Sequence, residues 1–492
     1  MTPQPAATTF VNPVLRGDRP DPSVLKVGDE YWLTYSSFES EPGMLLYRSR
    51  DLVNWTYHGA SVQKPPGVAF APDIAEVDGH FYIYIPFMPA PWSKLDSPAI
   101  FVIHADSMEG PWSEPIDLGF RGAIDPGHVV GEDGKRYLFV NGIRRIGLTD
   151  DGLATVGELE HVYDGWHYPD EWITESYGLE SPKLLRRGDW FYLISAVGGT
   201  GGPPTGHMTI AARSRSVHGP WENSPINPVS RTTDPSQGWW SRGHGTIVPG
   251  HGDDWWMLSH GFENGYRTLG RQILLEEITW TEDDWPVGRA EIGGELRAPA
   301  GAAPQARASD FQDDFSEMRL GERWTFHAPG AGESDRLSID DGLVMTGKGT
   351  SPSDTSPLAI VVGDHSYEIE VDVELLGDSV EGGLLLFFSN KLFCGIGIDG
   401  TGMPTYFGGH GSHWKEPAPP ARRLQLRVRN DEHIVTSWYR APGEEWTRHQ
   451  LRWETSGYHA NTMGDLLSLR PAIYAVGDGA VRLRDFRYTS LD

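Results

Sequence analysis

The chain has 492 residues, which is too long for one ordinary domain, so two or three domains are expected. Its net charge of −27 excludes a nucleic-acid partner, because the phosphates would be repelled. The single cysteine, Cys394, excludes an internal disulfide, and its apolar surroundings (KLFCGIGI) predict a buried thiol.

The N-terminal segment MTPQPAATTF lacks the basic and then apolar pattern of a secretion signal. No apolar run approaches the ~20 residues of a membrane span, and no basic stretch suggests an anionic membrane partner. The sequence therefore predicts a cytoplasmic protein without a membrane partner. The alternative is a secreted protein whose signal has been removed.

Five stretches of the first 280 residues share one pattern. Each begins with a polar, often proline-containing step, followed by an apolar strand, a glycine-containing turn and an aromatic strand. The glycine-containing turns (VGDE, VDGH, EDGK, RRGD, HGDD) are typical of hairpins. The stretches span residues 21–37, 71–87, 124–142, 180–199 and 243–262. A repeat of this length in a β-rich chain predicts a five-bladed propeller.

An acidic residue or histidine opens each repeat, at intervals of roughly 50–65 residues: Asp21, Asp73, Asp125, Glu180 and His244. When the prolines are aligned, Asp21, Asp125 and Ser181 match, so Glu180 lies one residue early and Asp73 two residues late. We therefore expect a shared end of the inner strands and not identical positions. Inner strands begin near one end of the propeller axis, and a funnel lined by carboxylates suits acid/base chemistry on a glycosidic bond.

The second half of the chain reads as a separate β domain. The segment RAPAGAAPQARAS, rich in alanine and proline, marks a linker. Alternating strands without helices follow and suggest a two-sheet sandwich. The predicted boundaries are a propeller over 1–296, a linker over 297–310 and a sandwich over 311–492.

Several motifs then identify a known family. In order, they are RPDPS (19–23), SSFESEPGMLLYRSRDLVNW (36–55), FAPDI (70–74), IDP (124–126), ESPKL (180–184), RGHG (242–245) and LGRQILLEEITWTEDDWPV (269–287). Through them the chain resembles glycoside hydrolase family 43, in the branch with a C-terminal sandwich that includes many β-xylosidases. The resemblance implies an all-β chain, with a five-bladed β-propeller followed by a concanavalin A-like β-sandwich.

The resemblance also implies catalytic roles. Asp21 matches the general base, Glu180 the general acid, and Asp125 the residue that orients the acid and tunes its pKa, in a reaction that inverts the anomeric centre. A carboxylate such as Asp125 near Glu180 is expected to raise the pKa of the acid. The alternatives are structural: Asp21 between its two prolines could cap a turn, and Glu180 could lie on the surface.

Further residues are expected around the sugar. Phe38 and Phe70 match family positions for apolar walls, and Arg271 matches an arginine that reaches into the sugar pocket. Trp240 is a weaker candidate for a platform. Asp73 is predicted near the substrate, although a structural acceptor is its commoner role.

The resemblance places His244 on the propeller axis, where in some members the histidine helps to hold a calcium ion, mostly through water. Calcium prefers oxygen ligands, so one histidine is a weak signal for a metal. No cofactor is expected to be required, and calcium would be structural.

Together these features predict an exo-acting, inverting β-D-xylosidase that releases terminal xylose from short β-1,4-xylooligosaccharides. An α-L-arabinofuranosidase, or an enzyme with both activities, is the alternative. A non-catalytic sugar-binding propeller ranks lower, because all three carboxylates are present. An enzyme joined to a carbohydrate-binding sandwich is a further alternative, and a homo-oligomer stays open.

Overall fold

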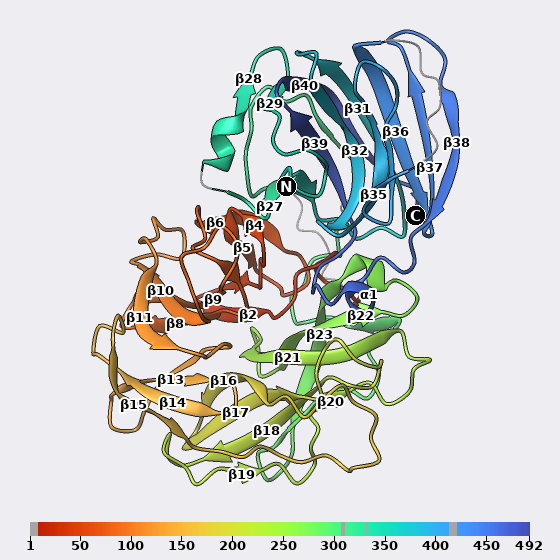
Figure 1. The fold of residues 1–492 in the computed structure, drawn as a ribbon. Helices are drawn as coiled ribbons and strands as arrows, with labels where there is room; N and C mark the ends of the chain where they lie inside the picture. Colours follow the sequence, from red (N-terminus) through yellow and green to blue (C-terminus); the bar gives the residue numbers. More distant parts are fainter. Residues whose placement is uncertain (1–7, 307–309, 331, 413–420) are drawn as a thin grey trace, which may run out of the picture. The chain divides into compact units, whose positions relative to one another are not determined.

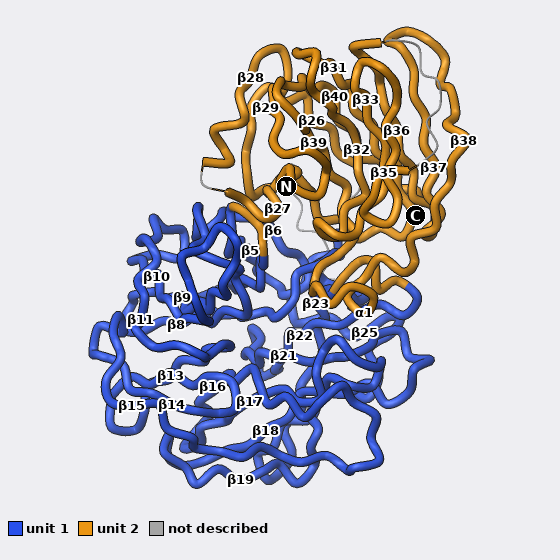
Figure 2. Tube along the Cα trace, viewed as in Figure 1, with its two compact units in different colours: residues 1–38, 42–265, 271–306 blue, residues 39–41, 266–270, 307–492 orange. Residues whose placement is uncertain are grey.

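The computed structural model describes residues 8–306, 310–330, 332–412 and 421–492, and nearly all of its regular structure is β-strand. The chain forms two compact units (Figures 1 and 2). The first comprises residues 1–38, 42–265 and 271–306, and the second comprises residues 39–41, 266–270 and 307–492. Among the described residues, no helix is long and apolar enough to cross a membrane.

Five antiparallel sheets of the first unit each contain four strands that pair in chain order. Blade one is β2 (Ser23–Val27), β3 (Glu30–Thr34), β5 (Gly43–Ser49) and β6 (Thr56–Val62). Blade two is β8 (Asp73–Val77), β9 (His80–Met88), β10 (Ala99–Ala105) and β11 (Ile116–Arg121), with β7 (Val68–Ala69) also paired to β9. Blade three is β12 (Gly127–Val130), β13 (Arg136–Val140), β14 (Arg144–Leu148) and β15 (Thr155–His161).

Blade four is β16 (Glu180–Arg187), β17 (Trp190–Val197), β18 (Met208–Ser214) and β19 (Glu222–Asn223), with β20 (Ser230–Arg231) also paired to β18. Blade five is β21 (Trp239–Pro249), β22 (Trp255–Glu263), β23 (Arg271–Trp280) and β24 (Pro286–Val287). The inner strands contact one another in a ring, from β2 through β8, β12, β16 and β21 back to β2. The predicted five-bladed propeller is confirmed.

The hairpins follow the local sequence. In blade two, Val77 pairs with His80, so Asp78 and Gly79 form a two-residue turn. Their φ angles are 51° and 80°. Two residues with positive φ give the turn whose twist matches that of the flanking strands, and Asp-Gly is among the pairs that adopt it most readily.

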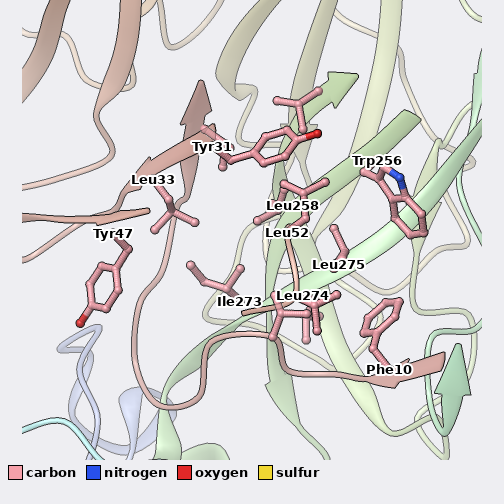
Figure 3. Close-up of a cluster of buried hydrophobic side chains, with 14 of the residues drawn as sticks. Phe10, Tyr31, Leu33, Tyr47, Leu52, Trp256, Leu258, Ile273, Leu274 and Leu275 are labelled. Atoms are coloured by element: carbon pink, nitrogen blue, oxygen red, sulfur yellow. The ribbon is translucent and has the colours of Figure 1, made fainter. Parts of the chain in front are cut away.

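The first and last blades are joined by the N-terminal segment. Strand β1 (Thr9–Val11) pairs with β25 (Glu295–Arg297), and Leu15 bridges to Ile273 of β23. Figure 3 shows Phe10 beside side chains of blades one and five in one buried cluster. Burial of each large apolar side chain contributes about 1.5–3 kcal/mol, so this cluster fixes the ends of the ring.

The second unit consists of two eight-stranded antiparallel sheets. One contains β26 (Phe311–Asp313), β28 (Leu337–Ile339), β29 (Leu343–Thr346), β31 (Ser366–Leu375), β36 (Arg423–Asp431), β37 (Ile434–Arg440), β38 (Thr447–Glu454) and β40 (Ala480–Ser490). The other contains β4 (Ser40–Glu41), β27 (Trp324–His327), β30 (Leu358–Ile360), β32 (Val380–Ser389), β33 (Leu392–Ile398), β34 (Thr405–Phe407), β35 (His410–Gly411) and β39 (Arg470–Gly477).

The two sheets pack face to face, with β32 against β31, β36 and β40. Their inner faces form a β-sandwich, as predicted. Cys394 in β33 is completely buried, which confirms the expected core thiol. The helical segments described are short: η1 (Arg267–Leu269), η2 (Glu333–Arg336) and α1 (Ala460–Met463).

The second unit also takes in two short segments of the first 296 residues, Glu39–Glu41 and Tyr266–Gly270. Within that unit, β4 pairs with β27 and Leu469 donates its N–H to the carbonyl of Thr268. The composition of the sequence did not predict that these two segments belong to the second unit. Part of the predicted linker, residues 307–309, lies outside the described residues.

Candidate active site

An unusual backbone conformation recurs just before or within the inner strands. Asp21, Asp125, Ser181 and His244 have φ angles of 60°, 55°, 56° and 54°. Non-glycine residues rarely adopt this region, and such strain concentrates at functional sites. The first three are the positions that the proline alignment brings together. Blade two departs from the pattern, because its residue before proline is Ala71, which is not among the positive-φ residues.

This conformation directs backbone N–H groups at side chains of the site. The N–H of Ser181 donates to Oδ2 of Asp125 at 3.2 Å, and the N–H of Asp21 donates to Nδ1 of His260 at 3.0 Å. The strand register also shifts between Glu180 and Lys183 and on either side of Gly243. Bulges of this kind re-aim side chains beside active sites.

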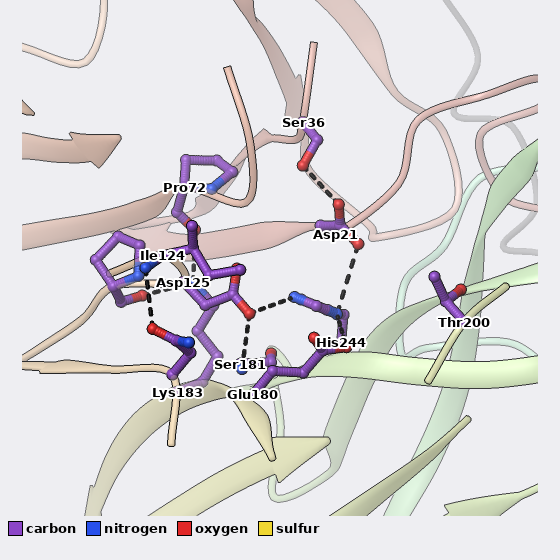
Figure 4. A network of polar contacts seen from close by, with 12 residues as sticks. Asp21, Ser36, Pro72, Ile124, Asp125, Glu180, Ser181, Lys183, Thr200 and His244 are labelled. Carbon is purple, nitrogen blue, oxygen red and sulfur yellow. Dashed lines mark hydrogen bonds and ion pairs between the residues drawn. The ribbon is translucent and has the colours of Figure 1, made fainter. Parts of the chain in front are cut away.

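The three predicted catalytic carboxylates meet at His244, as Figure 4 shows. Nδ1 of His244 lies 3.5 Å from Oδ1 of Asp21 and 3.8 Å from Oε1 of Glu180, and Nε2 lies 3.5 Å from Oδ2 of Asp125. Asp21, Asp125 and His244 are buried, whereas the side chain of Glu180 keeps 24% of its surface exposed. Residues from four blades thus form one cluster with Glu180 as its most accessible acid.

Asp21 is held in its ionised form. Burial alone would raise the pKa of Asp21, but the Arg271 guanidinium and His244 outweigh it and leave the pKa well below its usual value. Nη1 of Arg271 donates to Oδ1 at 2.8 Å, and the Ser36 hydroxyl donates to Oδ2 at 2.5 Å. Such a carboxylate can accept a proton near neutral pH.

Glu180 is shifted in the opposite direction. Burial raises the pKa of Glu180, and Asp21 adds to the rise, while His244 and Arg271 oppose it. Asp125 is not the main cause that the sequence suggested. Its own pKa is raised by burial, by Glu180 and by Asp21, and its carboxylate contacts His244 and the Ser181 N–H. Asp125 and Glu180 are therefore linked through His244 and through the backbone N–H of Ser181, the residue that follows Glu180.

His244 carries the charge that balances this cluster. Burial would lower the pKa of His244, but Asp21, Asp125 and Glu180 raise it to about 9. An imidazolium has two N–H donors and no free lone pair for a metal. A calcium ion near the axis would therefore take its ligands from oxygen atoms, including water, and not from the His244 ring.

A transition-metal site finds no better support in the same place. His207, His244 and His260 bring ring nitrogens within 4.8 Å of one another. However, Nδ1 of His207 and Nε2 of His260 lie 3.2 Å apart and form a hydrogen bond. One of these two nitrogens therefore uses its lone pair to accept that bond and cannot bind a metal. Calcium near the propeller axis stays a prediction.

The residues predicted for the sugar pocket gather beside Asp21. The rings of Phe38 and Phe70 meet edge to face with centroids 5.2 Å apart, and the guanidinium of Arg271 lies 5.5 Å from the Phe38 ring. Nη2 of Arg271 is buried and forms no hydrogen bond with a described residue. A buried donor without a partner is costly, so this atom is a candidate for binding a sugar hydroxyl.

Asp73 supports the inner strands. Its Oδ1 accepts from Nζ of Lys183 at 2.9 Å and from the Ser23 hydroxyl at 3.2 Å, and its Oδ2 accepts from the N–H of His128 at 2.8 Å. Lys183 also donates to the carbonyl oxygens of Pro72 and Pro126. These bonds tie blades one to four together and match the structural alternative for Asp73.

Trp240 lies near the start of β21, and its indole N–H donates to the carbonyl of Pro235 in the segment between β20 and β21. Sequence reasoning missed His207 and His260, which lie completely buried between the catalytic carboxylates. A usable signal existed for His260, since it interrupts the apolar strand WWMLSHGF. Buried histidines in such runs need a polar partner.

Comparisons with known proteins identify the family of this chain. The family model for glycosyl hydrolases family 43 matches residues 10–286. A non-reducing end α-L-arabinofuranosidase, BoGH43B of Bacteroides ovatus, is 33% identical over 342 residues, which are 65% of this chain and 61% of that protein. A xylan 1,3-β-xylosidase of Vibrio sp is 33% identical over 368 residues, 65% of either chain. The alignments thus span less than two thirds of either relative.

Solved structures extend the likeness to both units. The family 43 protein BlXynB from Bacillus licheniformis superimposes with a TM-score of 0.85 at 25% identity, covering 98% of this chain and 100% of that one. Xylan β-1,4-xylosidase from Bacillus halodurans gives a TM-score of 0.86 at 23% identity, covering 98% and 100%. Since the family model covers more than half of the residues, the chain belongs to glycosyl hydrolase family 43.

Proposed function

We propose that this protein is an exo-acting, inverting β-D-xylosidase that removes terminal xylose from short β-1,4-xylooligosaccharides. The observation that carries the proposal is the opposite displacement of two pKa values in one cluster: the pKa of Asp21 lies well below its usual value, and the pKa of Glu180 is raised above its own. A glycosidase needs one carboxylate and one carboxylic acid on either side of the scissile bond.

The proposed reaction follows from these two pKa shifts, with Asp21 as the base and Glu180 as the acid. Glu180 donates its proton to the oxygen of the leaving sugar, and the glycosidic bond breaks. Asp21 takes a proton from the water that attacks the anomeric carbon from the opposite face. At the end of the step, Asp21 carries the proton taken from water, and Glu180 is a carboxylate until proton exchange restores both.

The other residues position the sugar and the acid. Nη2 of Arg271 would donate to a hydroxyl of the terminal xylose, with Phe38 and Phe70 as the apolar wall against its CH face. His244 holds Asp125, and its positive charge reduces the repulsion between Asp21 and Asp125. No cofactor is needed for these steps.

Inversion is supported by the family resemblance and is compatible with the geometry. The contacts of Asp21 and Glu180 with Nδ1 of His244 put these two carboxyl oxygens roughly 7 Å apart at most, which reaches the range of about 6.5–9.5 Å found for inverting enzymes. The ~5–5.5 Å separation of retaining enzymes also lies below this upper limit on the distance. Proton NMR of the first sugar released from a β-xyloside decides: α-xylose supports inversion, and β-xylose overturns it.

The second candidate is α-L-arabinofuranosidase activity, alone or together with xylosidase activity. Its support is that relatives named for each activity are equally similar to this chain, at 33% identity. Hydrolysis of 4-nitrophenyl β-D-xylopyranoside and 4-nitrophenyl α-L-arabinofuranoside, with Asp21→Ala as control, tests both. Preference for the xyloside supports the first proposal, and preference for the arabinoside replaces it with the second. Activity on neither substrate, in a folded protein, contradicts both.

A cytoplasmic location completes the proposal, because it suits an enzyme that finishes imported oligosaccharides. Cell fractionation of the source organism with an antibody to the chain tests it. Recovery of the protein in the culture medium would contradict it.

A further inference from the structure

Two histidines that the mechanism above does not use connect the general base with the general acid. His260 lies in β22 and His207 directly precedes β18, and both side chains are completely buried. The N–H of Asp21 lies 3.0 Å from Nδ1 of His260, Nε2 of His260 lies 3.2 Å from Nδ1 of His207, and Nε2 of His207 lies 3.1 Å from Oε1 of Glu180. The contacts form an unbroken path from Asp21 to Glu180.

Both rings are neutral, so each has one N–H. Burial, with His244 and Arg271 adding to it, lowers the pKa of His207 to about 3. Burial and Arg271 lower the pKa of His260 well below its usual value, although Asp21 opposes them. A neutral imidazole donates from one nitrogen and accepts at the other.

The backbone N–H of Asp21 fixes the direction of the path. An amide can only donate, so Nδ1 of His260 accepts and its Nε2 carries the proton. The same Nδ1 lies 3.0 Å from Oδ1 of Asp21, which would favour a proton there instead. We assign Nδ1 as the acceptor because a protonated Nδ1 would leave the buried backbone N–H of Asp21 unpaired, whereas Oδ1 keeps its hydrogen bond from Arg271 in either case.

The second ring follows from the first. The Nε2–H of His260 has Nδ1 of His207 at 3.2 Å and the Thr200 hydroxyl at 3.3 Å as acceptors. Nδ1 of His207 then accepts, and its proton lies on Nε2, which faces Oε1 of Glu180. That buried nitrogen forms no aligned hydrogen bond with a described residue. Catalytic hydrogen bonds are often poorly aligned without substrate and tighten in the reacting complex.

We propose that His260 and His207 are positioning residues that form a directed hydrogen-bond chain from the N–H of Asp21 to Oε1 of Glu180, and so keep the acidic proton of Glu180 on Oε2. The inference rests on the proposed function, since it specifies how the acid of that reaction is presented to the leaving oxygen. A donor facing Oε1 excludes a proton on that oxygen. The proton on Oε2 is then the one transferred.

The hydrogen-bond chain also stabilises the transition state. When the O–H bond of Oε2 breaks, its electron pair stays on Glu180, and the carboxylate becomes a stronger acceptor at Oε1. The bond from His207 therefore strengthens as the proton leaves for the sugar oxygen. Interactions that strengthen in the transition state accelerate the reaction.

Two variants of one residue separate this role from simple packing. His207→Phe keeps a ring but removes both hydrogen bonds. His207→Gln keeps a carbonyl that can accept from His260 and an amide that can donate to Glu180. His128→Phe is the matched control, because His128 is a buried, neutral imidazole of blade three that stacks on Tyr84. Thermal melting of the wild type and the three variants shows which are folded.

The main readout is the dependence on the leaving group. We expect His207→Phe to lower kcat on xylobiose by about 10-fold to 100-fold, and on an activated 4-nitrophenyl xyloside by less than about 3-fold, because that leaving group needs little acid help. His207→Gln is expected to recover most of the loss. Equal losses on both substrates, or no recovery by glutamine, would mean that His207 only supports packing.

The pH profile is the second readout. Glu180 faces His207, His244, Asp21 and Arg271, and only the first is changed. Loss of a donor that stabilises the carboxylate raises the pKa of Glu180, so the basic limb of kcat/KM should move upward by about one pH unit in His207→Phe. An unmoved limb overturns the proposal.

A measurement without turnover separates this inference from the proposed function. Nitrogen NMR of protein containing 15N-histidine distinguishes protonated from unprotonated ring nitrogens. The proposal predicts Nε2–H on both His207 and His260 at neutral pH. Nδ1–H on both rings would reverse the chain and overturn it. Wild-type protein inactive on every xyloside would refute the proposed function while leaving this result standing.

Discussion

Arg271 and Asp21 are 250 positions apart in the chain, yet Nη1 of Arg271 donates a hydrogen bond of 2.8 Å to Oδ1 of Asp21. Both groups are buried, with 3% and 7% of their side chains exposed. The guanidinium holds the proposed base in its ionised form and has a second nitrogen free of hydrogen bonds to described residues. It thus joins base activation and sugar binding in one side chain.

Arg271→Met should separate these two roles. Loss of the cation raises the pKa of Asp21, so the acidic limb of kcat/KM should move to higher pH, and KM for the xyloside should rise because a hydroxyl loses its donor. Initial rates from pH 4 to pH 9 check both effects. An unchanged acidic limb would remove Arg271 from the control of Asp21.

The wild-type enzyme should have a bell-shaped pH profile. Asp21 must be ionised, so activity falls as the pH drops through its depressed pKa; Glu180 must be protonated, so activity falls as the pH rises through its elevated pKa. Profiles of kcat/KM on an unactivated xylooligosaccharide check this. A profile without a basic limb would contradict the acid assignment.

Stability should also depend on His244. Its pKa is about 9 in the folded protein, against 6.5 as the ordinary value. The stabilisation is therefore fully present below about pH 6.5 and is lost as the pH rises to about 9. Denaturant unfolding gives the free energy of unfolding at pH 6 and at pH 9. Between these two pH values, this free energy should decrease more for the wild type than for His244→Gln. Equal decreases would mean that His244 is not protonated in the folded state.

Chelation should leave the activity unchanged, because the His244 imidazolium already balances the surrounding carboxylates. Initial rates before and after dialysis against EDTA, with calcium restored to one portion, measure this. A loss of activity that calcium reverses would place an ion at the axis and contradict the charge assignment of His244.

Local pattern was sufficient to predict the propeller and the meeting of Asp21, Asp125 and Glu180 near one end of its inner strands. The hairpin turns and prolines recur along the chain, and the aligned positions Asp21, Asp125 and Ser181 share one backbone conformation in the structure. Each of these signals is contained within a few residues. The same holds for Phe38, Phe70 and Arg271, which were carried over by motif and lie together.

The partners of those residues could not be predicted in the same way. His207 contacts Glu180 within blade four, but His260 contacts His207 and Asp21 only when blades four, five and one come together, and no short motif encodes these contacts. The charge of His244 likewise depends on three carboxylates from other blades. Sequence gave the residue types, but burial and ring closure decide their protonation states.

The central claim is that Asp21 is the base and Glu180 the acid, and one comparison of two variants tests it most directly. The measurement is kcat/KM of Glu180→Ala and Asp21→Ala on xylobiose and on 4-nitrophenyl β-D-xylopyranoside. Both variants should lose at least ~10²-fold on xylobiose, and the activated substrate should restore much of the activity of Glu180→Ala but not of Asp21→Ala. Equal losses of Glu180→Ala on both substrates, or full activity of either variant, would contradict the assignment.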